Sequence, residues 1–553
     1  NLLIHKDKDK DFKKKLNLTN KYKKFLFKIL YLRLKKVHKN NISKREYKIL
    51  LGRWIKFYVD TNFFRYNYLI DNIKKNKIEH YYFKFNETIN YIPNTTSDYI
   101  ENVDDQERNN YLNWKILNFF KKKHNYKKIK IFHKKTKKKL FFNRFNEIYN
   151  LKGFKFNLAN TLNFFLKLFL KKNSPIIVTS YLPRIEELLL QLKNKTFFLW
   201  QYFFYKKNYE LNLILRKKKI KRDKIYIGKN YNGFKGLLLD LLDDYFPKCF
   251  LENYKEMHNF VKKNMLVQKP NFIFTSNEFV YNEFFKSYLI LAIQNKSKYV
   301  VGQHGSAYGS LLDQFKTTEE ETSDYFLTWG WKQVSNHIPV GMFNIIGKKI
   351  SSKSYKNNSI KNLVLINTNY PHKKNFWDIN EQYLSNFHQQ LNFLKFLDFS
   401  LFKKVIVRCH PADNKYFNFF KSKYKSINKK VIIDYGNQKI ENYLNNETLV
   451  VFSYLSSGFF ELFSRKFNCL SFDNLKKDHY QKNFLRELKN LKKKKFFFED
   501  GILASKHIND LVNKRNFNNL DNKVFDKNNL GFIKKYANSN YVNLKLVHKK
   551  INK

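Results

Sequence analysis

The chain of 553 residues is 43% hydrophobic and 18% aromatic, so it can bury a large core, and its length favours two or more domains. Its formal net charge of +61 comes from lysines spread along the whole chain, beside abundant Asn, Ile, Phe and Tyr, which also have AT-rich codons. Because codon bias explains this charge, we expect no specific nucleic-acid partner, only salt-sensitive attraction to polyanions or an anionic membrane surface.

The three cysteines are far apart in the sequence, at Cys249, Cys409 and Cys469. This spacing excludes a disulfide framework and a zinc site built from cysteines, and it fits a reducing compartment. No run of about 18 apolar residues predicts a membrane-spanning helix.

The N-terminal part of the chain is predicted to be helical. Residues 1–45 form a basic segment, which begins at Asn1 rather than Met and is therefore expected to be truncated. Its stretch KYKKFLFKILYLRLKK (21–36) could lie on a membrane surface, although an ordinary surface helix is favoured. Apolar residues at helical spacing predict a helix over 45–75 with a break at Gly52, whereas the pattern over 80–150 is weak.

Short apolar runs alternate with helical stretches over the rest of the chain, which predicts parallel strands covered on both faces. The first set of predicted strands is followed by a polar linker at 348–362 and by a second set. The first set comprises 175–181, 271–277, 299–303, 325–330 and 343–347, and the second comprises 363–368, 404–410, 430–436, 448–454 and 468–473.

This pattern predicts an α/β chain with two Rossmann-like domains that face each other across a cleft, preceded by the helical basic region. Residues 46–347 would be the acceptor-side domain with helical insertions. Residues 363–553 would be the domain that binds a nucleotide donor.

Ligands of open α/β sheets bind beyond the carboxyl ends of the strands, so polar residues at those ends are the candidates for a site. In VVGQHGSAYG (300–309), His304 stands between glycines at a strand end, in a chain with only 15 glycines. The other residues expected in the cleft are Gln303, Gly305, Tyr308, Trp329, Asn369 and Tyr370.

The second set of strands carries groups suited to phosphate. In RCHPAD, Arg408 and His410 end a strand, and both side chains can hold phosphate. In YLSSGFFELF, a predicted helix starts at Ser456, Ser457 and Gly458, where backbone N–H groups suit an anion, and Glu461 could accept a hydrogen bond from a ribose hydroxyl. A histidine at a strand end of each domain and a phosphate site in the second domain together indicate a nucleotide-activated group transferase.

Several other chemistries lack their motif. The sequence has no Walker loop, no GxGxxG fingerprint and no nucleophile elbow. A single aspartate, Asp324, precedes the YFLTWGW stretch instead of a DxD pair, so we predict neither a metal site nor a cofactor.

Segments in order along most of the chain resemble a family of transferases of bacterial surface-carbohydrate biosynthesis with a glycosyltransferase-B-like fold. These segments are VHKNNISKREYKILLGRWIKFYVDTNFFRY (37–66), TSYLPRIEELLLQL (179–192), VVGQHGSAYG, EEETSDYFLTWGW (319–331), INTNYPH (366–372), VRCHPAD (407–413) and YLSSGFFELF (454–463). The HG and HP motifs are also distantly similar to those of CDP-glycerol glycerophosphotransferases.

The resemblance implies that His304 is the general base and that His410, with Arg408, holds the donor phosphate. It also implies a carbohydrate or lipid-linked acceptor and a cytoplasmic location, peripheral at the inner membrane face. Two positions depart from the family pattern. Ser306 stands where a second glycine is usual, and His372 replaces an arginine, which puts a phosphate role for that position in doubt.

Alternatives remain at the level of the sequence. Glu319 is a second candidate base, and His304 could instead cap its own glycine-rich turn. The whole chain could be a non-catalytic binding protein for polyanions or a membrane surface, or an epimerase of the same two-domain shape.

Overall fold

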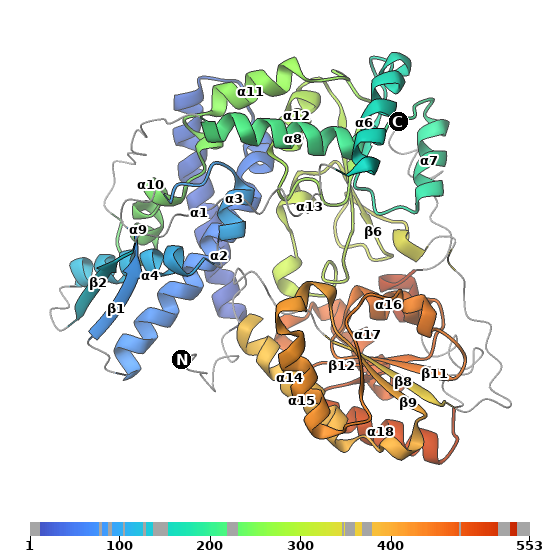
Figure 1. Cartoon of the computed structure of the whole chain (residues 1–553). Coiled ribbons are helices and arrows are strands. Elements are labelled where there is room, and N and C mark those ends of the chain that lie inside the picture. Colours follow the sequence, from blue (N-terminus) through green and yellow to red (C-terminus); the bar gives the residue numbers. More distant parts are fainter. Residues whose placement is uncertain are drawn as a thin grey trace.

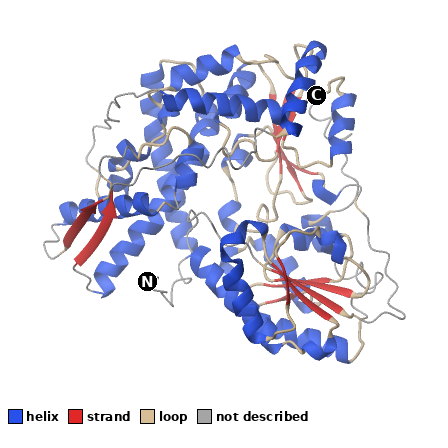
Figure 2. Ribbon diagram, viewed as in Figure 1, coloured by secondary structure: helices blue, strands red, loops and turns tan. Residues whose placement is uncertain are grey.

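A computed structural model of the chain describes most of its residues. These are residues 12–76, 80–86, 91–102, 105–124, 129–136, 153–217, 231–345, 348, 360–367, 379–474, 477–517 and 531–538. Within them the protein is an α/β structure with three parallel sheets surrounded by helices (Figures 1 and 2).

Two long helices form the start of the chain. Helix α1 (Phe12–His38) buries one face against α2 (Lys44–Asn76) through Leu26, Leu30 and Leu34. The stretch 21–36 is therefore part of a packed helix, and its apolar face is not available to a membrane.

The predicted break at Gly52 is wrong, because α2 continues through this residue. A Cβ atom at Gly52 would lie 2.5 Å from the Thr318 Cγ2 atom on α13 (Thr318–Thr322). The glycine therefore lets α13 approach α2 closely, and it does not interrupt the helix.

The region with a weak pattern contains a small separate sheet. Strands β1 (His80–Phe85) and β2 (Lys130–Lys135) pair in parallel and pack on α4 (Gln106–His124), whereas α3 (Thr96–Glu101) contacts α2. Phe85, which is fully buried, attaches this sheet to the core by packing on Tyr111 and Trp114 of α4.

A five-stranded parallel sheet follows, in the order β3-β4-β5-β6-β7. Its strands are β3 (Ile176–Val178), β4 (Phe272–Thr275), β5 (Lys298–Gly302), β6 (Tyr325–Thr328) and β7 (His337–Pro339). The helices in this half are α6 (Phe154–Leu166), α7 (Arg184–Lys193), α8 (Trp200–Lys217), α9 (Gly233–Asp240), α10 (Leu242–Tyr245), α11 (Tyr254–Lys263) and α12 (Glu283–Gln294). Alternate strand residues enter two different cores, Val301 one and Val300 the other, so both faces of the sheet are covered, as continuous apolar strands require.

A six-stranded parallel sheet forms the rest, in the order β10-β9-β8-β11-β12-β13. Its strands are β8 (Asn362–Ile366), β9 (Lys404–Arg408), β10 (Ile432–Asp434), β11 (Thr448–Phe452), β12 (Cys469–Phe472) and β13 (Phe497–Phe498). Renumbered from β8, the order is 3-2-1-4-5-6, which is that of a Rossmann fold. Its helices are α14 (Ile379–Phe396), α15 (Phe417–Ile427), α16 (Ser457–Ser464), α17 (Lys482–Lys493) and α18 (Gly501–Asn513).

Short 3-10 helices complete the described elements. They are η3 (Lys167–Phe169), η4 (Lys248–Phe250), η5 (Leu312–Gln314), η6 (Phe343–Ile345), η7 (Phe399–Leu401), η8 (Pro411–Tyr416), η9 (Ile440–Tyr443) and η10 (Lys477–His479).

One predicted strand is wrong. Residues 343–345 of the predicted strand 343–347 form η6 instead, while β7, six residues earlier, takes the edge of the sheet. The Met342 N–H donates to the Asn538 carbonyl at 2.9 Å, so the chain is held here by the C-terminal segment 531–538 and not by a neighbouring strand. The apolar Phe343 side chain packs over Gly302 instead of into a strand position.

The halves that contain the two larger sheets contact each other directly. Leu311 forms an isolated antiparallel bridge with Tyr480, and the Gln481 N–H donates to the Ser310 carbonyl at 2.7 Å. Most of the predicted linker, residues 349–359, lies outside the described residues, so the domain boundaries stay predictions.

Candidate functional site

The carboxyl ends of β3 and β4 carry polar residues that bond to each other. The Ser276 N–H donates to the Thr179 carbonyl at 3.0 Å, and the Ser276 hydroxyl donates to the Ser180 carbonyl at 2.8 Å. Thr179 and Tyr181 have φ angles of +48° and +60°. A left-handed conformation is costly for a β-branched threonine, and strain of this kind gathers at binding and catalytic sites.

Gln303 organises the loop that follows β5. Its side-chain oxygen accepts hydrogen bonds from the Trp329 N–H and the Trp331 indole, each at 2.9 Å. Its amide nitrogen donates to the carbonyl oxygens of Gly305 at 2.9 Å and Tyr308 at 3.3 Å. Gln303 and Trp329 are both buried, so these two predicted cleft residues fix the conformation of the loop from the protein interior.

Glycines on either side of His304 have separate structural reasons. A Cβ atom at Gly302 would lie 2.5 Å from both the Phe343 ring and the Ser276 hydroxyl. Gly309 has a φ of +76°, and its Cβ would lie 2.5 Å from the Trp331 ring. Ser306 is not among the described residues with positive φ, so serine fits the position where the family usually has glycine.

His304 lies at the end of β5 among aromatic rings. The centroids of Tyr308, Tyr181 and Phe279 are 5.1, 5.9 and 6.4 Å from the imidazole centroid. Burial first, and then the positive charge of Arg53, lowers the pKa of His304 to about 4, against the opposing effects of Glu319 and of a hydrogen bond to the Ser276 backbone. The imidazole is therefore neutral at neutral pH.

The Nδ1 atom of His304 is buried and has no hydrogen-bond partner among the described residues. The bond to the Ser276 backbone raises the pKa, which is the effect of an imidazole N–H that donates to a carbonyl. The neutral ring keeps one nitrogen lone pair, which can accept a proton.

A buried charge cluster lies next to His304. The Arg53 guanidinium of α2 is 2.5 Å from a Glu319 carboxylate oxygen and donates to the Tyr308 hydroxyl at 3.2 Å. The Tyr308 hydroxyl donates to the same Glu319 oxygen. Both contacts are made by one oxygen of Glu319, while its other oxygen is buried without a partner among the described residues, so its role as the second candidate base stays a prediction.

Arg53 is a site residue that sequence reasoning missed. Its only signal is a charged residue within a mostly apolar helical stretch, and its partner Glu319 is 266 positions away. Ion pairs from Lys48 to Glu321 and from Arg45 to Asp324 flank it, so α2 holds the segment around α13 by charge as well as by packing.

Helix α16 begins at the point where the strand order of the second sheet reverses, between β8 and β11. The Ser456 hydroxyl accepts from the Phe459 N–H at 3.1 Å, so the predicted helix start is confirmed. The Ser457 hydroxyl accepts from the Ser306 N–H at 3.0 Å. Gly458 packs close to the Phe452 ring, because a Cβ atom at this position would lie only 3.1 Å from the ring. The loop of His304 and the start of α16 are therefore in direct contact.

Arg408 and His410 both lie at the end of β9, as predicted. The Arg408 guanidinium is paired with Asp434 at 2.5 Å and donates to the Gln438 carbonyl at 2.6 Å, while the His410 side chain is exposed. A ligand phosphate that binds Arg408 would share it with Asp434.

Glu461 faces the first half of the chain. Its carboxylate accepts from Asn344 at 2.9 Å and is paired with Lys348 at 2.7 Å and Arg465 at 3.1 Å. These contacts tie α16 to the residues around the start of the linker, and its predicted ribose contact stays a prediction. Asn369 and Tyr370 lie outside the described residues.

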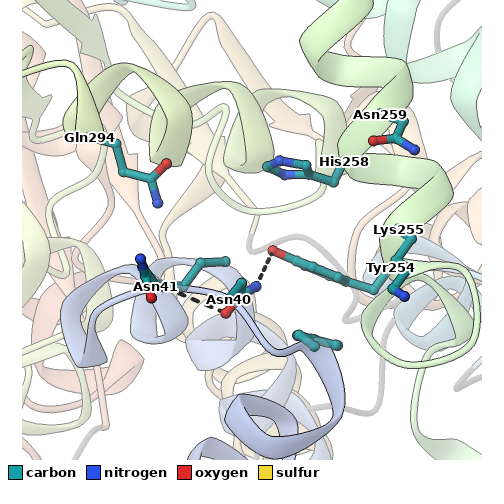
Figure 3. Close-up of a pocket in the computed structure, with 9 residues that line it drawn as sticks. Asn40, Asn41, Tyr254, Lys255, His258, Asn259 and Gln294 are labelled. Atoms are coloured by element: carbon teal, nitrogen blue, oxygen red, sulfur yellow. Dashed lines mark hydrogen bonds between the residues drawn. The ribbon is translucent and has the colours of Figure 1, made fainter.

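The described residues contain no cluster of three or more His, Cys, Asp or Glu side chains that could hold a metal ion. A cavity of about 490 Å³ does exist, but at the other end of the first sheet (Figure 3). Gln294 at the end of α12 lines it, and β5 begins four residues later, so the cavity is near the start of the strands and away from His304. Asn40 and Tyr254 face each other there with a hydrogen bond of 3.0 Å, and none of the predicted site residues lines the cavity.

Comparison with known proteins identifies a family. A family model described as the LIC12162 family transferase matches residues 2–516. No curated protein matches the sequence.

Proposed function

The chain belongs to the LIC12162 family of transferases, and from that premise we propose that it moves a sugar, polyol or polyol-phosphate group from a nucleotide-activated donor to a hydroxyl acceptor. The contact between the His304 loop and the start of α16, through Ser306 and Ser457 at 3.0 Å, is the observation that carries the proposal. It brings a candidate base from one sheet to the reversal point of the other, where Rossmann folds bind nucleotides. The two sheets would then belong to two domains arranged as in glycosyltransferase-B enzymes, acting in bacterial surface polysaccharide or glycoconjugate synthesis in the cytoplasm.

His304 would remove the proton from the acceptor hydroxyl. A neutral imidazole has one ring nitrogen with a free lone pair, which can accept that proton. The low pKa of His304 is set by burial and by Arg53, and an anionic donor bound beside the ring would raise it. The base would therefore become stronger when the donor is in place.

The leaving phosphate would be stabilised from the second sheet. The N-terminus of α16 carries the positive end of a helix dipole, and Arg408 and His410 follow β9, which is separated from β11 only by β8. Such donors stabilise developing negative charge without any proton transfer of their own. Neither a metal nor a cofactor is part of this proposal.

Nucleotide binding tests the donor site without knowledge of the acceptor. We would measure the shift in melting temperature on addition of CMP, CDP, UDP or GDP at physiological ionic strength, for the wild type, Arg408→Ala and His410→Ala. Lys404→Ala is a matched control, because Lys404 is an exposed cation at the opposite end of the same strand. A ligand at 100 times its Kd stabilises a protein by about 2.7 kcal/mol, which is a readily measured shift.

One nucleotide should stabilise the wild type and Lys404→Ala more than the others do, and this selective shift should disappear in Arg408→Ala and His410→Ala. His304→Asn should keep it, because that residue would act on the acceptor. If all four nucleotides shift the melting temperature alike and only at low salt, the chain is a polyanion binder and the transferase proposal fails. If a nucleotide sugar is converted to a new sugar without any acceptor, the epimerase alternative holds.

A further inference from the structure

Helix α6 and the short helix η3 expose an apolar stripe to solvent. Phe154, Leu158, Leu162, Phe165 and Phe169 recur every three or four residues, so they share one helix face. Phe154 is 82% exposed and Phe169 is 74% exposed. The opposite face, with Ala159 and Asn163, is the buried one. Surface helices normally have the reverse polarity, so this stripe requires an explanation.

Helix α7 has a second stripe of the same kind. Ile185, Leu188, Leu189 and Leu192 are all exposed, Ile185 by 71%, while Leu190 and Gln191 face the protein. Strand β3, at the edge of the first sheet, lies between η3 and α7 in the chain. Figure 1 draws α6 and α7 at the same end of the molecule. The two stripes therefore lie at one end of the molecule, on helices that precede and follow the edge strand in the chain.

The charge around these stripes has one dominant sign. Between residues 153 and 197, seven basic residues accompany only two acidic ones, Glu186 and Glu187. The basic residues are Lys155, Lys167, Lys171, Lys172, Arg184, Lys193 and Lys195, and all seven are exposed. Large apolar side chains bordered by exposed Lys and Arg are the pattern of helices that lie on a bilayer with anionic headgroups.

The same surface continues to the candidate site. Tyr181 is exposed, precedes α7 by three positions, and has its ring 5.9 Å from that of His304. None of the described helices is long and apolar enough to cross a membrane, so contact would be with one surface of the bilayer.

We propose that α6, η3 and α7 form a docking face for an anionic lipid bilayer. The phenylalanine and leucine side chains of this face insert among the acyl chains, and its lysines pair with lipid phosphates. Docking in this orientation would bring the membrane to the Tyr181 side of His304. An acceptor carried by a lipid could then reach the base without leaving the bilayer, a consequence that rests on the proposed function.

Vesicle co-sedimentation of the full chain tests the docking face. Vesicles of phosphatidylcholine alone are compared with vesicles in which about a third of the lipid is phosphatidylglycerol, at physiological salt. The test variant is Leu168→Asp with Phe169→Asp, at positions 81% and 74% exposed. The matched control is Leu32→Asp with Leu503→Asp, which adds the same charge at apolar positions 51% and 50% exposed elsewhere. Melting temperatures and elution volumes of all three proteins are recorded alongside.

We expect the wild type and the control to bind the anionic vesicles. The test variant should bind them with an affinity at least about tenfold lower, at an unchanged melting temperature. Equal binding by all three proteins, or none by the wild type, would overturn the proposal. The proposal would also be overturned if the wild type self-associates and does not bind vesicles while the test variant elutes as a monomer, because a second copy of the chain would then cover the face. Nucleotide selectivity is measured without lipid, so either proposal can fail while the other stands.

Discussion

The buried pair of Arg53 and Glu319 gives a quantitative test of how the site is held. Their side chains are only 9% and 1% exposed, and Glu319 also accepts from Tyr308. Glu319→Ala would leave the Arg53 charge buried with one hydroxyl as its partner. Breaking a buried pair in this way costs about 3–5 kcal/mol. We expect the variant to lose that much unfolding free energy in urea, followed by tryptophan fluorescence.

Two further variants make the result interpretable. Glu499→Ala removes a half-exposed partner of Lys492, and such a pair contributes at most about 1 kcal/mol. The double variant Arg53→Met with Glu319→Gln removes both charges and keeps an acceptor for Tyr308, so it should recover most of the lost stability. If Glu319→Ala loses no more than Glu499→Ala, then Arg53 is not confined as its burial implies, and the reasoning is refuted.

Two other predictions concern the same region. Gly52→Ala should destabilise the protein by about 1–3 kcal/mol in urea, although alanine favours helices, because its Cβ would clash with Thr318. Adding Thr318→Ala to this variant should restore most of the lost stability. A single variant that is more stable than the wild type would contradict this prediction. The pKa of His304 is about 4 in the folded protein, below the ordinary 6.5, so the folded protein binds fewer protons than the unfolded chain. The free energy of unfolding is therefore highest above pH 6.5 and falls by about 3 kcal/mol for this group as the pH is lowered to 4. His304→Gln should reduce this loss of stability, measured as urea midpoints from pH 7 to pH 4, but only by the share of His304. Burial also lowers to about 4 the pKa of three other histidines, His38, His337 and His507. Identical pH profiles of the wild type and His304→Gln would contradict the assignment.

The sequence predicts most strands of the two large sheets because each is a continuous apolar run with a polar residue at its end. It misses β7 and β13, which have three and two residues, too few to show any period. It wrongly predicts a strand at 343–347, because Phe343 and Ile345 are apolar for packing rather than for pairing.

The candidate site is only partly visible in the sequence. His304 can be singled out because its strand end and its glycines are local features. The pairing of Arg53 with Glu319 and the contact of Ser306 with Ser457 join residues 266 and 151 positions apart, and no local pattern reports them. The exposed stripe of α6 is equally hidden, since its sequence would suit a helix buried on that side.

The C-terminal segment 531–538 has a mechanical consequence. After the second sheet is complete, the chain returns to the first half, where the Asn538 N–H donates to the Trp329 carbonyl at 3.1 Å. The chain thus crosses between the halves twice, in the covalent connection before β8 and in this returning segment, in addition to the contacts of Ser310 with Gln481 and of Ser306 with Ser457. Separation of the halves would therefore have to break the contacts of the returning segment as well, so this segment opposes large rearrangements of the protein.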